Sequence, residues 1–274
     1  MSTSVSGTTG ITFSDGSVLG SQLGIFNRII DGGFVINQRG YVSGTSLSSG
    51  TYGHDRWKGG ASAGTYTFTQ AALGVNTTIT ITAGSIIQVI EGCNLPEGGT
   101  YVLSWTGTAQ GRLNGGTYGS SGTVMVTGWT AGTNLNVEFN TGTLGNIQLV
   151  AGSSVSSYAY RPYGTELALC QRYAYATNGS NGVAGSGDTV SVQQRFPLPS
   201  MRATPTLTTI TAGSAIISDD YSANYTAASA GFSLQNANVQ FARVVITGFS
   251  GLTSGRFAAG LGTGTGVILF SAEL

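Results

Sequence analysis

The sequence predicts an all-β protein with two β-sandwich, jelly-roll-like domains that are joined by a short helix and preceded by an N-terminal assembly arm. Three observations predict this class. Short runs of alternating apolar and polar residues recur along the chain, glycine-rich turns separate them, and a single segment has the composition of a helix. Many short strands with such turns are typical of sandwiches and jelly rolls. The predicted boundaries are 1–20 for the arm, 21–163 and 180–274 for the sandwiches, and 164–179 for the helical hinge.

The arm contains a few apolar residues in short strand-like runs around a turn at 15–17. They are too few to form a core alone, so they need partners from outside the arm. We expect copies of the same chain to supply these partners, and the alternative is a disordered or cleaved tail. The oligomerisation residues are Ile11, Phe13, Leu19 and Leu23.

The first sandwich begins with two apolar strands in 25–38, interrupted at Asp31-Gly32-Gly33. We assign Trp57, Tyr101 and Trp105 to the core. Turn residues separate the remaining strands, which we expect at 66–70, 78–82, 86–90, 101–106, 124–126 and 134–139, and residues 147–149 and 158–160 close the domain.

The hinge has good helix formers, and we expect a helix over 165–176. Thr165 would cap its start with the side-chain hydroxyl. Leu167, Cys170 and Ala174 fall at helical spacing and would form one apolar edge. Asn178-Gly179 would end it.

The second sandwich repeats the strand pattern without repeating the sequence. Residues 188–194 alternate, Pro197 and Pro199 favour an extended segment, and 201–211, 232–245 and 267–270 read as strands. The glycine-rich stretch 260–266 reads as a surface loop, since it lacks the Lys-Ser/Thr ending of a phosphate-binding loop.

Composition restricts the classes of partner. Charged residues make up 8% of the 274, and the net charge is zero, so the electrostatic term that duplex nucleic acid requires is missing. No apolar run is long enough for a membrane span, and no signal peptide is expected. A surface that is polar through Ser, Thr and Asn is typical of extracellular β proteins, fibres and virion parts. We expect Cys93 and Cys170 to be buried thiols, with one disulfide as the alternative.

Residues for catalysis are scarce. His54 is the single histidine, no Gly-x-Ser-x-Gly motif occurs, and a His/Cys zinc site lacks ligands. Most carboxylates sit in or near turns, and the adjacent pair Asp219-Asp220 would point to opposite faces of a strand. We therefore expect no enzymatic activity and no cofactor or catalytic metal. A structural calcium ion at Asp31, Asp55 or Asp219/Asp220 stays open.

Residues that can bind a ligand are more numerous than residues suited to catalysis. Aromatic rings can stack on sugar faces, and arginine can donate hydrogen bonds to hydroxyls. Aromatic residues outside the alternating core register are candidates for this role, and Arg112 lies close to one of them in sequence. Covering of loops is the alternative role for such rings. The candidate ligand-binding residues are Tyr52, Arg112, Tyr118 and Trp129, and Tyr41 belongs to the same group by pattern.

Several segments resemble one family. Residues 27–39, NRIIDGGFVINQR, resemble the opening strand of bacteriophage tail-fibre and receptor-binding proteins with a carbohydrate-binding-module-like jelly roll. Asp55-Arg56-Trp57 resembles a second signature of the family, and residues 145–150 with 161–173 resemble a third. Residues 196–205, FPLPSMRATP, are similar to the start of the family's C-terminal domain, and 11–18 to its short arm.

The resemblance implies a homotrimer on a virion, attached to other tail or capsid proteins through the arm and made in the host cytoplasm. It implies non-enzymatic adhesion to a bacterial surface glycan, with the second sandwich as the host-contacting part. The loops 107–122 and 218–231 match no family pattern and leave the ligand open. The alternatives are a structural capsid or tail decoration protein and a glycan depolymerase.

Overall fold

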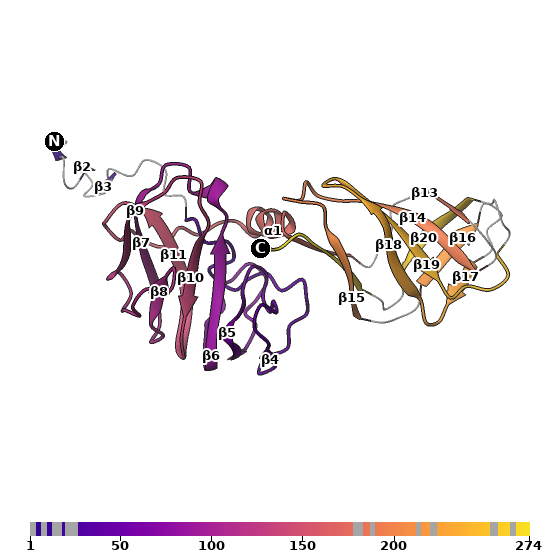
Figure 1. The fold of residues 1–274 in the computed structure, drawn as a ribbon, viewed down its shortest axis with the longest axis horizontal. Coiled ribbons are helices and arrows are strands. Elements are labelled where there is room, and N and C mark those ends of the chain that lie inside the picture. The colour runs from indigo at the N-terminus through magenta and orange to yellow at the C-terminus, as the bar shows by residue number, and fades with distance from the viewer. Residues whose placement is uncertain are drawn as a thin grey trace.

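The computed structural model describes residues 4–6, 10–12, 18–19, 27–177, 183–186, 190–211, 215–219, 224–252, 257–263 and 267–274. This described part is mostly β, with several antiparallel sheets and one short α-helix (Figure 1). None of its helices is both long and apolar enough to cross a membrane. The predicted all-β class is thus confirmed at this level.

The first sheet has eight strands and curls on itself. β4 (Ser46–Leu47), β5 (Lys58–Phe68), β6 (Ile79–Ile90), β11 (Gly142–Ala151), β7 (Gly99–Thr106) and β9 (Val124–Trp129) follow one another in it. β10 (Leu135–Phe139) pairs with both β6 and β8 (Gly111–Leu113). The start of β6 pairs with β11, whereas its end pairs with β10. This change of partner accompanies the curling of the sheet.

Gly84 lies where β6 changes partner. Its φ is +65°, and a Cβ atom there would lie 2.2 Å from the carbonyl oxygen of Ala63. Glycine is therefore required both for the backbone conformation and for the close approach of β5.

The first core consists of buried apolar residues contributed by the strands of this curled sheet and by residues before them. Trp57, Tyr101 and Trp105 all belong to it, as predicted, and none is more than 5% exposed. β10 alternates in the expected way, because Leu135, Val137 and Phe139 are buried on its core face.

Residues 27–38 correct the prediction of two strands, because the structure gives them no regular ladder. Side chains satisfy the backbone instead. The Gln88 amide accepts from the Ile30 N–H at 2.9 Å and donates to the Ile30 carbonyl at 2.7 Å. Asp31 Oδ1 accepts from the N–H groups of Val35 and Ile36. The segment is held by these side chains together with backbone bonds to β11, since the Arg28 N–H donates to Leu149 and the Ile147 N–H donates to Gly32.

The hinge helix α1 spans Tyr163–Gln171, so the predicted span 165–176 was wrong at both ends. Pro162 precedes the helix and accepts the N–H groups of Thr165 and Glu166, which makes Thr165 an internal residue without a capping role. Ala174 begins β12 (Ala174–Thr177), where it pairs with Ser271. Strand pairing therefore ends the helix before the expected apolar edge is complete. A 3₁₀ turn, η1 (Gly92–Asn94), lies in the first half of the chain.

The second half contains two further sheets. β12, β21 (Val267–Ser271) and β15 (Thr206–Thr211) form one. The other follows the order β17 (Asn224–Ala227), β16 (Ala215–Asp219), β20 (Phe257–Thr263), β13 (Val183–Ser186), β14 (Ser191–Pro197), β19 (Phe241–Thr247) and β18 (Gly231–Ala237). A separate core lies here, and it includes Phe196, Val244 and Phe270.

The glycine-rich stretch 260–266 is corrected in part. Residues 260–263 belong to β20, which pairs with β16 on one side and β13 on the other, and 264–266 lie outside the described residues. Residues 260–263 pair with β16, and this pairing organises a glycine-rich sequence that has no alternating pattern of its own.

The arm contains β1 (Ser4–Ser6), β2 (Gly10–Thr12) and β3 (Val18–Leu19) in one antiparallel sheet. Ile11 and Leu19 are opposite each other in its register. Phe13 and Leu23 lie outside the described residues.

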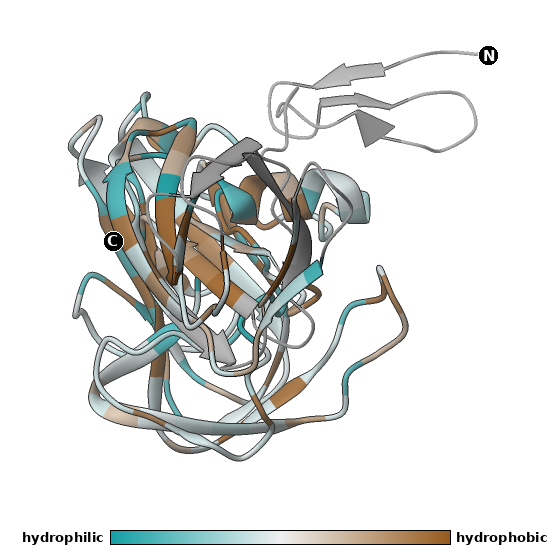
Figure 2. Cartoon of the chain, turned by 90° about the vertical axis from the view of Figure 1, so that its right-hand side faces the viewer, coloured by the Kyte–Doolittle hydropathy of each residue, from teal (hydrophilic) through white to brown (hydrophobic). Residues whose placement is uncertain are grey.

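Viewed along the long axis, apolar residues are concentrated on the inner strands, and much of the remaining chain is pale (Figure 2). Pale colouring marks residues of near-neutral hydropathy, in keeping with a chain that has few charges and 44 glycines.

The last residues of the sequence connect the two halves. After β21, the Glu273 carboxylate pairs with Arg39 at 3.0 Å and with Arg56. The Lys58 ammonium and the Tyr52 hydroxyl donate to the carbonyl oxygen of Leu274 at 2.6 and 2.7 Å. Arg202 donates to Glu91 at 3.0 Å and to the Ala272 carbonyl. We call residues 272–274 and these partners the joint.

Candidate functional site

A row of side chains crosses the first sheet on the face opposite its core. Tyr52 forms an isolated bridge with Lys58, Lys58 is opposite Ile87, Ile87 is opposite Glu138, and Glu138 is opposite Arg112. Residues directly opposite in a sheet share a face, so these side chains are neighbours. With Tyr118 beside Arg112, they form what we call the outer row: Tyr52, Lys58, Ile87, Glu138, Arg112 and Tyr118.

The outer row crosses four interstrand spacings, which corresponds to about 19 Å. Its members are half-buried except for Glu138, which is buried. This length, with a ring at each end and charged groups between, is suited to an extended polar ligand such as an oligosaccharide.

Arg112 and Tyr118 form the most organised end of the row. The guanidinium lies 4.4 Å from the centre of the Tyr118 ring and donates through Nε to Glu138 at 2.8 Å. Ser85 donates to the other Glu138 oxygen at 2.7 Å. Burial, followed by the nearby charge of Glu138, raises the pKa of Tyr118. The carboxylate fixes the guanidinium, which in turn fixes the ring.

Gly60 leaves room for this arrangement. A Cβ atom there would lie 2.0 Å from the Ser85 hydroxyl and 3.3 Å from a carboxylate oxygen of Glu138. Any larger residue would displace the hydroxyl that holds Glu138 in place.

Tyr52 forms the other end of the row and also belongs to the joint. Arg39 and Lys58 lie 4.9 and 5.6 Å from its ring centre. Burial, then the charge of Glu273, raises the pKa of Tyr52 to about 12, so its hydroxyl stays protonated and can donate to Leu274. Its hydroxyl is therefore committed to the joint.

The remaining candidates lie elsewhere. Trp129 ends the edge strand β9, donates to the Thr133 carbonyl at 3.2 Å and packs against the first core. Tyr41 is buried, with its ring centre 4.6 Å from that of Tyr66. The structure thus brings Arg112 and Tyr118 together, aligns Tyr52 with them, and separates Trp129 and Tyr41 from the row.

His54 is built into the core. It is fully buried, and its ring nitrogens lie 3.0 Å from the Tyr66 hydroxyl and 3.2 Å from the Gln70 amide oxygen. Burial lowers the pKa of His54 to about 4, with the Gln70 contact opposing the shift. A ring held neutral between two fixed partners serves packing here.

Asp31 and Asp55, which the sequence left as possible calcium ligands, are also buried. Asp31 binds backbone amides, and burial, followed by the charge of Asp55, raises its pKa well above the ordinary value. Asp55 accepts from Gln38 and Arg39, and burial raises its pKa to about 6. Asp219 lies in β16, and Asp220 is outside the described residues. Within the described part, no group of three or more His, Cys, Asp or Glu side chains is arranged for a metal.

The cysteines are both free, as expected, but only Cys170 is buried. Cys93 is exposed, which corrects the prediction of two buried thiols. Cys93 lies in η1, two residues after Glu91, and its sulfur is 3.8 Å from Nη2 of Arg172.

Sequence pattern missed Lys58, Ser85 and Glu138 as members of the site. Alternation placed Glu138 on the outer face of its strand, between Val137 and Phe139, but its neighbours there depend on pairing with β6 and β8. Pairing between strands distant in sequence is not readable from one strand's pattern.

No protein-family model, curated protein or solved structure matches this chain.

Proposed function

We propose that this chain is a bacteriophage tail-fibre or receptor-binding protein that attaches a virion to a bacterial surface glycan without cutting it. The outer row is the observation that carries this proposal. Tyr118 offers a ring face, and Arg112 offers donors for sugar hydroxyls, on one side of a sheet that a core supports. Fixed aromatic and charged groups of this kind bind ligands with little loss of side-chain entropy.

The finer architecture belongs to the same proposal. Two jelly-roll-like sandwiches, 21–163 and 180–274, are supported by the two separate cores and by the curling of the first sheet. The arm at 1–20 would hold three copies together and attach them to other tail or capsid proteins. The resemblance of residues 27–39, 161–173 and 196–205 to fibre proteins supports the same assignment.

The absence of cutting is part of the proposal and is supported by His54. Its burial and its two fixed partners keep it from substrate. In the outer row, Arg112 and Ser85 hold the Glu138 carboxylate in place, which favours a structural role for it.

Binding of a glycan panel by the purified full chain tests this function. We expect retention of one glycan class, a loss of affinity of about tenfold or more in Tyr118→Ala, and near-normal binding in Tyr118→Phe, which keeps the ring. A role as a structural decoration protein would give no glycan retention. Release of shortened glycan would indicate a depolymerase. Either result would overturn the proposal.

A further inference from the structure

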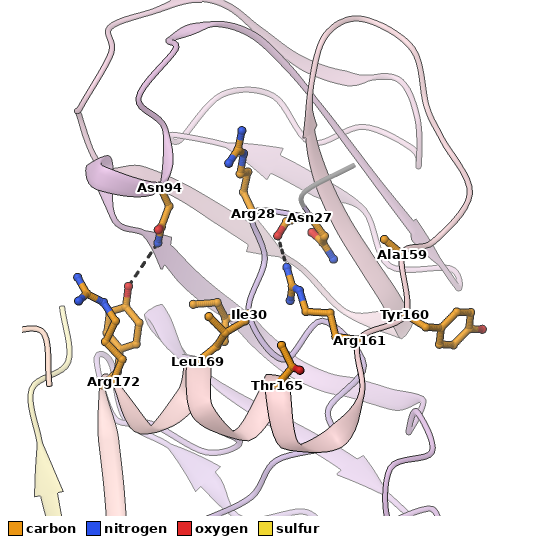
Figure 3. Close-up of a pocket in the computed structure, with 11 residues that line it drawn as sticks. Asn27, Arg28, Ile30, Asn94, Ala159, Tyr160, Arg161, Thr165, Leu169 and Arg172 are labelled. Carbon is orange, nitrogen blue, oxygen red and sulfur yellow. Dashed lines mark hydrogen bonds between the residues drawn. The ribbon is translucent and has the colours of Figure 1, made fainter. Parts of the chain in front are cut away.

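A cavity of about 490 Å³ lies between the start of the first domain and α1. The segment 27–30 forms one wall, α1 forms the opposite wall, and residues 159–161 close one end (Figure 3). The other end is formed by Asn94, Arg172 and Tyr173. This cavity is separate from the outer row, since the two share no residue.

The lining contains three arginines and no carboxylate. They are Arg28, Arg161 and Arg172. Each one pairs with a glutamate that is not part of the lining: Glu97, Glu166 and Glu91 respectively. The positive groups therefore border the cavity, and their partners lie behind them.

Arg161 has a structural task. Its guanidinium donates to Glu166 at 3.0 Å and to the carbonyl oxygens of Asn27 and Ile29. Figure 3 shows it directed toward Asn27, across the end of the cavity. These contacts hold the wall in place and leave the other two arginines for a ligand.

Arg28 and Arg172 are less fully used. The pair of Arg28 with Glu97 uses Nη2, while its Nε is buried and has no hydrogen-bond partner. The contacts of Arg172 with Glu91 and Cys93 also use one nitrogen, Nη2. The guanidinium nitrogens that border the cavity can donate to an anionic ligand.

The rest of the lining suits a sugar ring. Ile30 and Leu169 form an apolar surface between the arginines, and Thr165 is exposed on the helix beside them (Figure 3). The Tyr160 ring is 71% exposed and points outward from the cavity, with its centre 4.8 Å from that of Tyr158. It provides a stacking face for a unit that follows the bound one.

We propose that this cavity binds an acidic sugar unit, one that carries a carboxylate or a phosphate, with Arg28 holding the oxyanion. Planar guanidinium groups match the geometry of both anions. The inference rests on the proposed function for the sugar nature of the ligand and adds its charge and its place.

Saturation-transfer NMR and calorimetry on the full chain test the proposal with three probes: digalacturonic acid, glucose 6-phosphate and neutral maltose. We expect binding of one or both acidic probes and none of maltose. Arg28→Gln is expected to weaken the acidic probe about tenfold, through loss of a charge-assisted contact. Because Glu97 is 38% exposed, this variant leaves no buried charge.

A second pair of variants locates the probe independently of charge. Thr165→Trp fills the cavity from an exposed helix position and is expected to abolish binding. Ala168→Trp is the matched control, since Ala168 is exposed on the same helix and does not line the cavity. Equal binding of maltose, no binding of either acidic probe, or binding that survives Thr165→Trp would each overturn the proposal. Binding of the acidic probes as expected, in a protein that retains no bacterial glycan on the panel, would keep the cavity assignment and reject the adhesion function.

Discussion

At the scale of single residues, side chains carry out hydrogen bonding that a strand would otherwise provide. Gln88 lies on the core side of β6 and binds both backbone groups of Ile30, and Asp31 caps the N–H groups of Val35 and Ile36. Buried backbone groups need partners, so these two side chains fix the path of residues 29–36. That path places Arg28 and Ile30 along the cavity.

Gln88→Leu removes both partners of Ile30 at nearly constant volume. We expect a loss of about 2–5 kcal/mol in the free energy of unfolding, because two buried polar groups are left unpaired. Urea denaturation measures it. Gln110→Leu, at an exposed position, is the control and should change stability by about 0.5 kcal/mol or less. Equal effects of the two substitutions would show that the Gln88 bonds do not hold the segment.

Glu91 makes the stability of the folded protein depend on pH, and its contacts set the sign of this dependence. Burial alone would raise its pKa, but hydrogen bonds from Tyr173, Arg202 and Arg172 outweigh burial and lower the pKa to about 2 from 4.5. A lowered pKa means that the folded state binds fewer protons than the unfolded state, so the stabilisation is complete above about pH 5 and is lost toward pH 2.

The melting temperature of Glu91→Gln should therefore fall furthest below that of the wild type at pH 6–7, and the difference should shrink as pH approaches 3. Parallel thermal melts over this range check it. A difference that stays constant with pH would contradict the assigned contacts.

At the scale of elements, the sequence predicted which segments are strands better than where they end or what they pair with. Alternation identified the core residues Tyr101 and Trp105, which lie two turns of the pleat apart on one face of β7. The helix end was misplaced because Ala174 pairs with Ser271, nearly a hundred positions away in the sequence. The strand at 260–263 was not predicted, because its glycines provide no alternating pattern and only its pairing with β16 shows it.

The candidate site was likewise predictable only where its residues are close in sequence. Tyr118 and Arg112 are close in sequence, and their proximity could be anticipated. Glu138 and Lys58 join them only through the register of β5, β6, β10 and β8, and the cavity depends on a side-chain-held segment that was expected to be strand. Local pattern predicts local neighbours, while register and side-chain bonding decide the rest.

The ion pair of Glu273 with Arg56 in the joint leads to a further prediction at the scale of elements. Glu273 is the partner of Arg56, whose side chain is 1% exposed, so Glu273→Ala leaves a buried guanidinium uncompensated. We expect a loss of about 3–5 kcal/mol in stability. Glu97→Ala, which breaks the more exposed pair with Arg28, should cost about 1 kcal/mol or less. Chemical denaturation compares them, and a loss at Glu273 no larger than at Glu97 would contradict the buried ion pair.

At the scale of the whole molecule, two β-rich lobes are connected through α1, β12 and the joint (Figure 1). Joint contacts by Arg39, Arg56 and Lys58 hold residues 273 and 274 against the first half of the chain. The proposed adhesion would benefit from such a connection, because a second lobe that is held in place loses less entropy when it binds a surface.

The molar mass in solution tests the proposed assembly into trimers. We expect light scattering of the full chain to give three times the single-chain mass, and removal of residues 1–20 to give the single-chain mass, because the apolar residues of the arm supply the contact. A full chain that is monomeric by this measurement would contradict self-assembly through Ile11, Phe13, Leu19 and Leu23.

The most direct test of the account is whether the protein holds a glycan and leaves it whole. Surface polysaccharide from bacteria that the labelled protein stains can be incubated with the full chain and separated by size-exclusion chromatography with detection of both protein and sugar. Co-elution of the protein with polysaccharide of unchanged length is the predicted result. Separate elution of the two, or polysaccharide shortened by the protein, would contradict it.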